Sequence, residues 1–165
     1  MPSCLIVGFG NPLRSDDGVG LKAAAAIERE LASSSTSASS PSSRPLLSSL
    51  DVVVLAGQQL TPEMSEAVGC AERVLFLDAS HAGAAGEIRL LRIRRDPAFD
   101  PGSLSHDLEP SSLLELAARY FQAEPKAWLL TLTGENFELG ERFSPAVEGA
   151  WNAYLERIRS WISGL

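Results

Sequence analysis

The sequence is poor in several features that would mark a familiar class of protein. It holds only two cysteines, Cys4 and Cys70, which excludes a disulfide framework and favours two small buried thiols. No apolar run approaches the ~20 residues of a membrane span, and the N-terminus has no signal-peptide pattern. Basic side chains are outnumbered, 14 to 21, and form no dense cluster. These absences predict a soluble cytoplasmic protein that binds neither nucleic acid nor membrane.

The common motifs of nucleotide-binding and hydrolytic enzymes are also missing. There is no Gly-x-x-x-x-Gly-Lys-Ser/Thr loop, no His-Glu-x-x-His pair and no Gly-x-Ser-x-Gly elbow. Gly8-Phe-Gly10 begins like a dinucleotide fingerprint, but Leu13 stands where its third glycine is required. The chain has only two histidines, so a serine or cysteine triad would have to recruit His81 or His106. No nucleophile is placed by a recognisable turn, and such a triad is disfavoured.

The sequence does contain a regular alternation of apolar strands and amphipathic helices. Length and composition favour one domain over residues 1–165. The alternation predicts a three-layer α/β/α sandwich around a mostly parallel five-stranded sheet with one antiparallel strand. The segment 87–93 alternates apolar and polar side chains, which is typical of an edge strand. The expected strands are 3–8, 51–56, 74–78, 87–93 and 127–133, and the expected helices are 18–31, 61–69, 109–121 and one that Ser144 caps.

A serine-rich segment interrupts this pattern at residues 33–49. It carries too little apolar surface to offset the entropy of ordering it. We therefore expect a mobile surface insertion after the first helix, and not a linker between domains.

Polar side chains cluster where the predicted strands end. In parallel sheets, sites form beyond the carboxyl ends of the strands. This rule selects residues 11–17 after the first strand, 57–59 after the second and Asp78 after the third, and the loop before the 109–121 helix adds His106. Two carboxylates and an imidazole would offer oxygen and nitrogen ligands to a divalent metal with open positions. His81 is a second candidate ligand.

Each of these residues also has a purely structural interpretation. An aspartate at a helix start commonly caps the helix, which would account for one of Asp16 and Asp17. An aspartate that ends a strand, such as Asp78, often fixes a turn, and a loop histidine is usually solvated. Spacing alone therefore leaves the shared site and the structural interpretation open.

The first of these loops belongs to a longer recognisable stretch. Leu5-Ile-Val-Gly-Phe-Gly-Asn-Pro-Leu-Arg-Ser-Asp-Asp-Gly-Val-Gly20 resembles the signature of the hydrogenase maturation proteases, which trim the C-terminal extension from the large subunit of nickel-iron hydrogenases. The likeness covers nearly the whole chain in matching order. It continues through Gln59-Leu-Thr-Pro-Glu63, Phe76-Leu-Asp-Ala79, Gly86-Glu87, Ser105-His106 and Thr133-Gly-Glu-Asn-Phe-Glu-Leu-Gly140.

The resemblance implies roles for particular residues. It assigns nickel contact and catalysis to Asp17, Asp78 and His106, and leaves Asp16 to brace the loop or cap the helix. The nickel would belong to the partner, the hydrogenase large-subunit precursor. Cleavage would take place after nickel insertion and would proceed by metal-assisted hydrolysis.

Two other functions remain open at this point. A checkpoint protein could bind the same nickel-loaded precursor without cutting it. A phosphate- or nucleotide-binding module could use Gly8, Gly10 and the following helix N-terminus, but two carboxylates in that loop argue against it.

Overall fold

The computed structural model of the protein describes residues 4–36, 51–103 and 108–164. Its centre is a five-stranded sheet of order β2-β1-β3-β5-β4. Four strands are parallel, and the edge strand β4 runs antiparallel to β5. This confirms the predicted mostly parallel sheet and the edge position of the segment that alternates. The strands are β1 (Cys4–Phe9), β2 (Val52–Gly57), β3 (Arg73–Ser80), β4 (Ile88–Ile93) and β5 (Lys126–Thr133).

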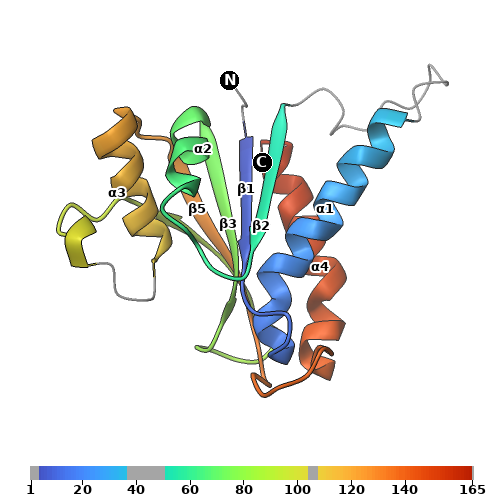
Figure 1. Ribbon diagram of the computed structural model, residues 1–165. Helices are drawn as coiled ribbons and strands as arrows, with labels where there is room; N and C mark the ends of the chain where they lie inside the picture. The colour runs from blue at the N-terminus through green and yellow to red at the C-terminus, as the bar shows by residue number, and fades with distance from the viewer. Residues whose placement is uncertain (1–3, 37–50, 104–107, 165) are drawn as a thin grey trace.

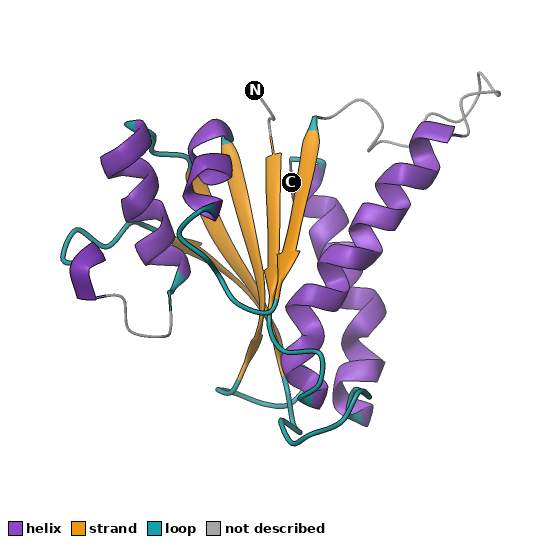
Figure 2. Ribbon diagram, viewed as in Figure 1, coloured by secondary structure: helices purple, strands orange, loops and turns teal. Residues whose placement is uncertain are grey.

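Helices cover both faces of the sheet, which makes the predicted three layers (Figures 1 and 2). On one face lie α1 (Val19–Thr36) and α4 (Pro145–Ile162), and on the other lie α2 (Met64–Cys70) and α3 (Pro110–Phe121). Two short 3-10 turns, η1 (Ser15–Gly18) and η2 (Pro101–Ser103), complete the described elements. Within the described ranges, no helix is both long and apolar enough to cross a membrane.

The central strands are apolar on both sides because each face of the sheet carries its own core. Ile6 of β1 lies in the core under α1 and α4, whereas its neighbour Leu5 lies in the core beside α2 and α3. In β3, Leu77 and Phe76 divide between the two cores in the same way. All four side chains are fully buried. Each buried side chain of this size stabilises the fold by roughly 1.5–3 kcal/mol.

Two glycines allow α1 to lie directly against the sheet. A Cβ atom on Gly8 would overlap the carbonyl oxygen of Gly20, and one on Gly20 would overlap the carbonyl oxygen of Leu77. The close approach fixes where α1 begins relative to β1 and β3. It therefore also fixes the loop between β1 and α1, which carries the two adjacent aspartates.

Helix α1 is longer than the sequence predicted. It continues past residue 31 to Thr36, because the Ser33 and Ser34 hydroxyls donate to the carbonyl oxygens of Arg29 and Glu30, each at 2.9 Å. Serine can bond the preceding turn in this way and so be accommodated in a helix. The remainder of the serine-rich insertion, residues 37–49, lies outside the described residues.

Two further expectations need correction. Helix α2 begins at Met64, not at Thr61, because Thr61 and Pro62 form a turn whose carbonyl oxygens accept from Met64 and Ser65 N–H, both at 3.1 Å. Neither Cys4 nor Cys70 is in a disulfide, and only Cys4 is buried. Cys70, the last residue of α2, is exposed, so the expectation of two buried thiols was wrong for it.

Candidate active site

A cavity of about 520 Å³ opens at the carboxyl edge of the sheet. Two of the predicted site residues, Asp17 from η1 and Asp78 from β3, line it together. Gln58 and Gln59, which follow β2, also line it, as the strand-end rule predicted. His106 lies outside the described residues. The apolar part of the wall consists of Phe9, Leu60, Ile93, Leu108 and Leu129.

Asp17 is held at this cavity by the tight loop that follows β1. Its Oδ2 atom accepts the backbone N–H of Asn11 at 2.8 Å. Gly10 has a φ of 138°, and a Cβ atom there would overlap the Asp17 carbonyl oxygen. The N–H of Gly10 also lies 3.3 Å from the carbonyl oxygen of Gly57, which ties this loop to the end of β2. A side chain at position 10 would therefore displace Asp17.

Asp78 lies inside β3, two residues before its end, whereas the sequence predicted a strand that ends at Asp78. The pairing of β1 with β3 stops at Gly8 and Leu77, so Asp78 still emerges at the carboxyl edge of β1. The pKa of Asp78 is raised to about 7, chiefly by burial. The Ala79 N–H, which its Oδ1 atom accepts at 2.8 Å, lowers the pKa, and the nearby Asp17 carboxylate adds to the rise. One carboxyl of the pair is therefore poised to gain or lose a proton near neutral pH.

Asp16 serves the fold, as the sequence predicted. Its carboxylate is fully buried and accepts the backbone N–H groups of Glu135 and Asn136 on Oδ2, at 2.8 and 2.9 Å, and that of Ser144 on Oδ1, at 2.8 Å. Burial opposes ionisation, but these hydrogen bonds hold the pKa of Asp16 below its usual range. The ionised side chain thereby fastens the β1–α1 loop to the loop that leads into α4.

His81 is not among the described residues that line the cavity. It is exposed, and its ring stacks on that of Phe137 with a centroid distance of 3.8 Å and an interplanar angle of 22°. This contact anchors the turn after β3 to the loop after β5. It gives His81 a structural role and leaves its candidacy as a metal ligand without support.

The sequence interpretation missed the contribution of the start of α3. Glu109 and Ser111 line the cavity, although Glu109 was taken only as part of the signal for a helix start. Glu109 is the N-cap residue of α3, but its side chain makes no capping hydrogen bond. Its closeness in sequence to His106 was the available signal, because that loop was already expected at the site.

The described residues alone do not form a complete metal site. Within ranges 4–36, 51–103 and 108–164, no three His, Cys, Asp or Glu side chains are placed to hold one ion together. Asp17 and Asp78 supply two carboxylates to one cavity. Such a pair can offer oxygen ligands to a divalent cation or exchange a proton with a substrate.

Several solved structures with the same fold are hydrogenase maturation proteases. The NiFe hydrogenase maturation protease HycI from Thermococcus kodakarensis KOD1 is 20% identical, with a TM-score of 0.65 over 98% of this chain and 90% of that chain. The hydrogenase maturating endopeptidase HybD from E. coli is 22% identical, with a TM-score of 0.68 over 96% and 91%. The protein has the fold of the hydrogenase maturation proteases. An endopeptidase from Escherichia coli is similar as well, at 23% identity and a TM-score of 0.67 over 98% and 94%.

Comparisons of sequence add nothing to this likeness of fold. No family model matches the chain, and no curated protein matches it. At identities this low, the fold of the hydrogenase maturation proteases says where a site can form but not what it does. The function has to be argued from the cavity that holds Asp17 and Asp78.

Proposed function

We propose that this protein is an endopeptidase that removes the C-terminal extension of a nickel-iron hydrogenase large-subunit precursor after nickel has been inserted. The observation that carries the proposal is the meeting of Asp17 and Asp78 in one cavity at the carboxyl edge of the sheet. The motif that contains Asp17 and the shared fold with hydrogenase maturation proteases support it.

The nickel would arrive with the substrate, so that only a precursor that already contains nickel would be cleaved. The two carboxylates repel each other, since the charge of Asp17 raises the pKa of Asp78. A cation between them would turn this repulsion into attraction, whereas a precursor without nickel would leave it in place. A precursor that lacks nickel would therefore bind poorly and stay uncut.

Hydrolysis requires activation of a carbonyl group and of a water molecule. The substrate's nickel would polarise one of them, with Asp17, Asp78 and the imidazole of His106 as protein ligands. A carboxylate released from the metal would take the proton of the attacking water and pass it to the leaving amine. The raised pKa of Asp78 makes it the better candidate for this transfer.

The test is intact-mass measurement of a precursor incubated with the purified protein. Precursor from cells grown with nickel should lose its C-terminal extension, and precursor from cells grown without nickel should keep its mass. The variants Asp17→Asn, Asp78→Asn and His106→Ala should each stop cleavage while remaining folded. The matched control is Glu66→Gln, which removes an exposed charge of α2 outside the cavity lining and should cleave normally.

Two results would contradict the proposal. One is normal cleavage by all three site variants, which would reject Asp17, Asp78 and His106 as the residues that carry out the reaction. The other is binding of the nickel-loaded precursor with its mass unchanged, which would make the protein a checkpoint without catalytic activity.

A further inference from the structure

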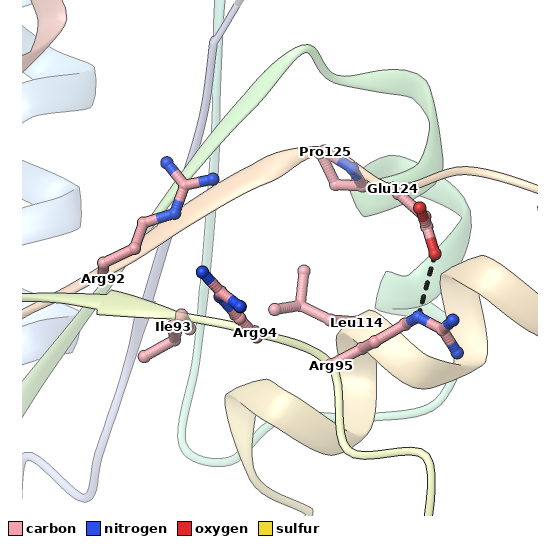
Figure 3. A pocket seen from close by; sticks show the side chains of 7 residues that line it. All are labelled: Arg92, Ile93, Arg94, Arg95, Leu114, Glu124 and Pro125. Carbon is pink, nitrogen blue, oxygen red and sulfur yellow. Dashed lines mark ion pairs between the residues drawn. The ribbon is translucent and has the colours of Figure 1, made fainter.

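A second pocket adjoins the cavity that holds Asp17 and Asp78, because Ile93 lines both. It has a volume of about 220 Å³ and is lined by the 92–95 segment, Leu114 of α3 and the residues that precede β5 (Figure 3). Ile93 pairs with Ala127, whereas Asp78 pairs with Thr131, four residues further along β5. At about 3.3 Å per residue, Asp78 and Ile93 are roughly 13 Å apart along the strand direction.

Three arginines line this pocket, and their partners differ. Arg95 is neutralised, because it forms ion pairs with Glu115 at 3.0 Å and with Glu124 at 2.9 Å. Within the described part of the chain, neither Arg92 nor Arg94 has an ion-pair partner. Figure 3 shows their guanidinium groups on the same side of the segment, while Arg95 turns toward Glu124. Two positive charges thus face one pocket uncompensated.

Two other arginines near this pocket do have ion-pair partners. Arg89, on the same edge strand, is matched by Glu87 at 3.1 Å, and Arg119 of α3 is matched by Glu115 at 2.8 Å. Arginine on an edge strand can simply discourage pairing with other chains. That role does not require two guanidinium groups at one pocket. Arg92 is also oriented, because its guanidinium carbon lies 4.3 Å from the centre of the Trp128 ring.

We propose that Arg92 and Arg94 form a binding site for a phosphate group, either free phosphate or the monoester of a small molecule. Two guanidinium groups match a dianion, and a phosphate group carries a charge of about −1.5 to −2 near pH 7 with three acceptor oxygens. A single carboxylate would leave one positive charge uncompensated. The pocket, about 220 Å³, is smaller than the ~300–1,000 Å³ of sites that enclose drug-sized ligands, so it suits the phosphate group and a short stem.

The site is tested by adding inorganic phosphate to the ¹⁵N-labelled full chain and following its amide resonances. The resonances of residues 92–95 and Glu124 should shift and saturate. Sodium chloride and sodium acetate, at the same ionic strength, should not reproduce these shifts. Equal shifts with either salt would overturn the proposal, because they would show screening or general anion binding.

Variants then assign the binding to the two arginines. Arg92→Gln or Arg94→Gln should weaken phosphate binding at least tenfold, and Arg92→Lys should weaken it less because the charge remains. Arg157→Gln, on α4 and outside the pocket lining, should bind like the unchanged protein. Unchanged binding by the double variant Arg92→Gln/Arg94→Gln would reject the site. Circular dichroism verifies folding, which is expected since both side chains are exposed.

A final comparison identifies the source of the phosphate group. Glycerol phosphate that binds more tightly than inorganic phosphate would indicate a monoester ligand, and equal affinity would indicate free phosphate. Binding of succinate without binding of phosphate would contradict the assignment. Precursor cleavage should be unaffected in both arginine variants, because neither Arg92 nor Arg94 lines the cavity that holds Asp17 and Asp78. This separates failure of the phosphate site from failure of the proposed protease.

Discussion

Asp16 and Asp17 are adjacent in the chain, yet their side chains lie in different environments. The carboxylate of Asp16 is buried against the backbone of the 135–144 segment, where it accepts three N–H groups. The carboxylate of Asp17 lines the cavity that also contains Asp78. The 3-10 turn that carries both residues thus joins a structural anchor to a candidate catalytic group, and the two can be separated experimentally.

Replacing Asp16 by asparagine should destabilise the protein. The amide has one acceptor oxygen in place of two, so at least one buried N–H group loses its partner and the charge that strengthens the others disappears. We expect a loss of roughly 2–4 kcal/mol at pH 7 in urea unfolding. The control Asp17→Asn should cost less, because Asp17 accepts the single backbone N–H of Asn11.

The pH dependence of this loss has a definite sign. The pKa of Asp16 is lowered by folding, so its stabilising effect is present above the ordinary aspartate pKa of 3.8 and is lost as the pH falls through the lower pKa of the folded state. The difference between the variant and the unchanged protein should therefore shrink in acid. A difference that stays constant from pH 7 down to pH 2 would contradict the role given to the Asp16 charge.

The meeting of Asp17 and Asp78 was predictable because parallel strands end at a common edge. That rule did not distinguish Asp16 from Asp17, and only the resemblance to the hydrogenase maturation proteases assigned their different roles. The rule could not reveal that β3 runs on past Asp78. Apolar side chains become sparse after Leu77, yet Ala79 and Ser80 still pair with β5. Nor could it reveal Glu109, because its presence in the cavity depends on how α3 packs against the sheet.

Asp78→Asn should stabilise the protein at neutral and alkaline pH. Folding raises the pKa of Asp78 from 3.8 to about 7, so the ionised form is disfavoured in the folded state. The stability that protonated Asp78 contributes to the folded protein is fully present below pH 3.8 and is lost as the pH rises through about 7. This rise in pKa corresponds to a loss of roughly 4 kcal/mol at most in the free energy of unfolding. Urea unfolding should show the variant's advantage growing from pH 4 to pH 8.

An equal advantage at pH 4 and pH 8 would show that Asp78 has an ordinary pKa in the folded protein. The stabilised variant should also be inactive under the proposed function. Together these results would mark Asp78 as a residue kept for activity at the expense of stability.

Gly10→Ala should damage both the fold and the site. The φ of 138° is unfavourable for alanine, and the added Cβ would push against the Asp17 carbonyl oxygen. We expect a loss of at least about 1–3 kcal/mol, together with loss of precursor cleavage. Gly149→Ala is the matched control, because Gly149 lies within α4 and a Cβ there meets no atom within 4 Å.

The control should gain up to about 1 kcal/mol, since alanine is the better helix former. Thermal unfolding of the two variants measures both effects with the same chemical change. Equal effects of the two substitutions would show that neither the backbone conformation nor the close contact at Gly10 matters.

Cleavage of the nickel-loaded precursor should decline in mildly acidic solution. The value of kcat/KM reports the free enzyme, in which Asp78 gains a proton as the pH falls below about 7. A protonated carboxyl is a poor metal ligand and cannot accept the proton of water, and an imidazole ligand at His106 must also be neutral, with a reference pKa of about 6.5. We therefore expect kcat/KM to fall steadily from pH 7 to pH 5.5.

Temperature separates the two titrating groups in that profile. The pKa of a carboxyl group changes little on warming, whereas that of an imidazole falls. A midpoint that stays constant between two temperatures would assign the decline to Asp78, and one that falls on warming would assign it to His106. A value of kcat/KM that stays constant down to pH 5 would contradict both assignments. It would show that cleavage requires neither an ionised Asp78 nor a neutral His106. Full-length precursor and product, resolved by mass, provide the rates at each pH.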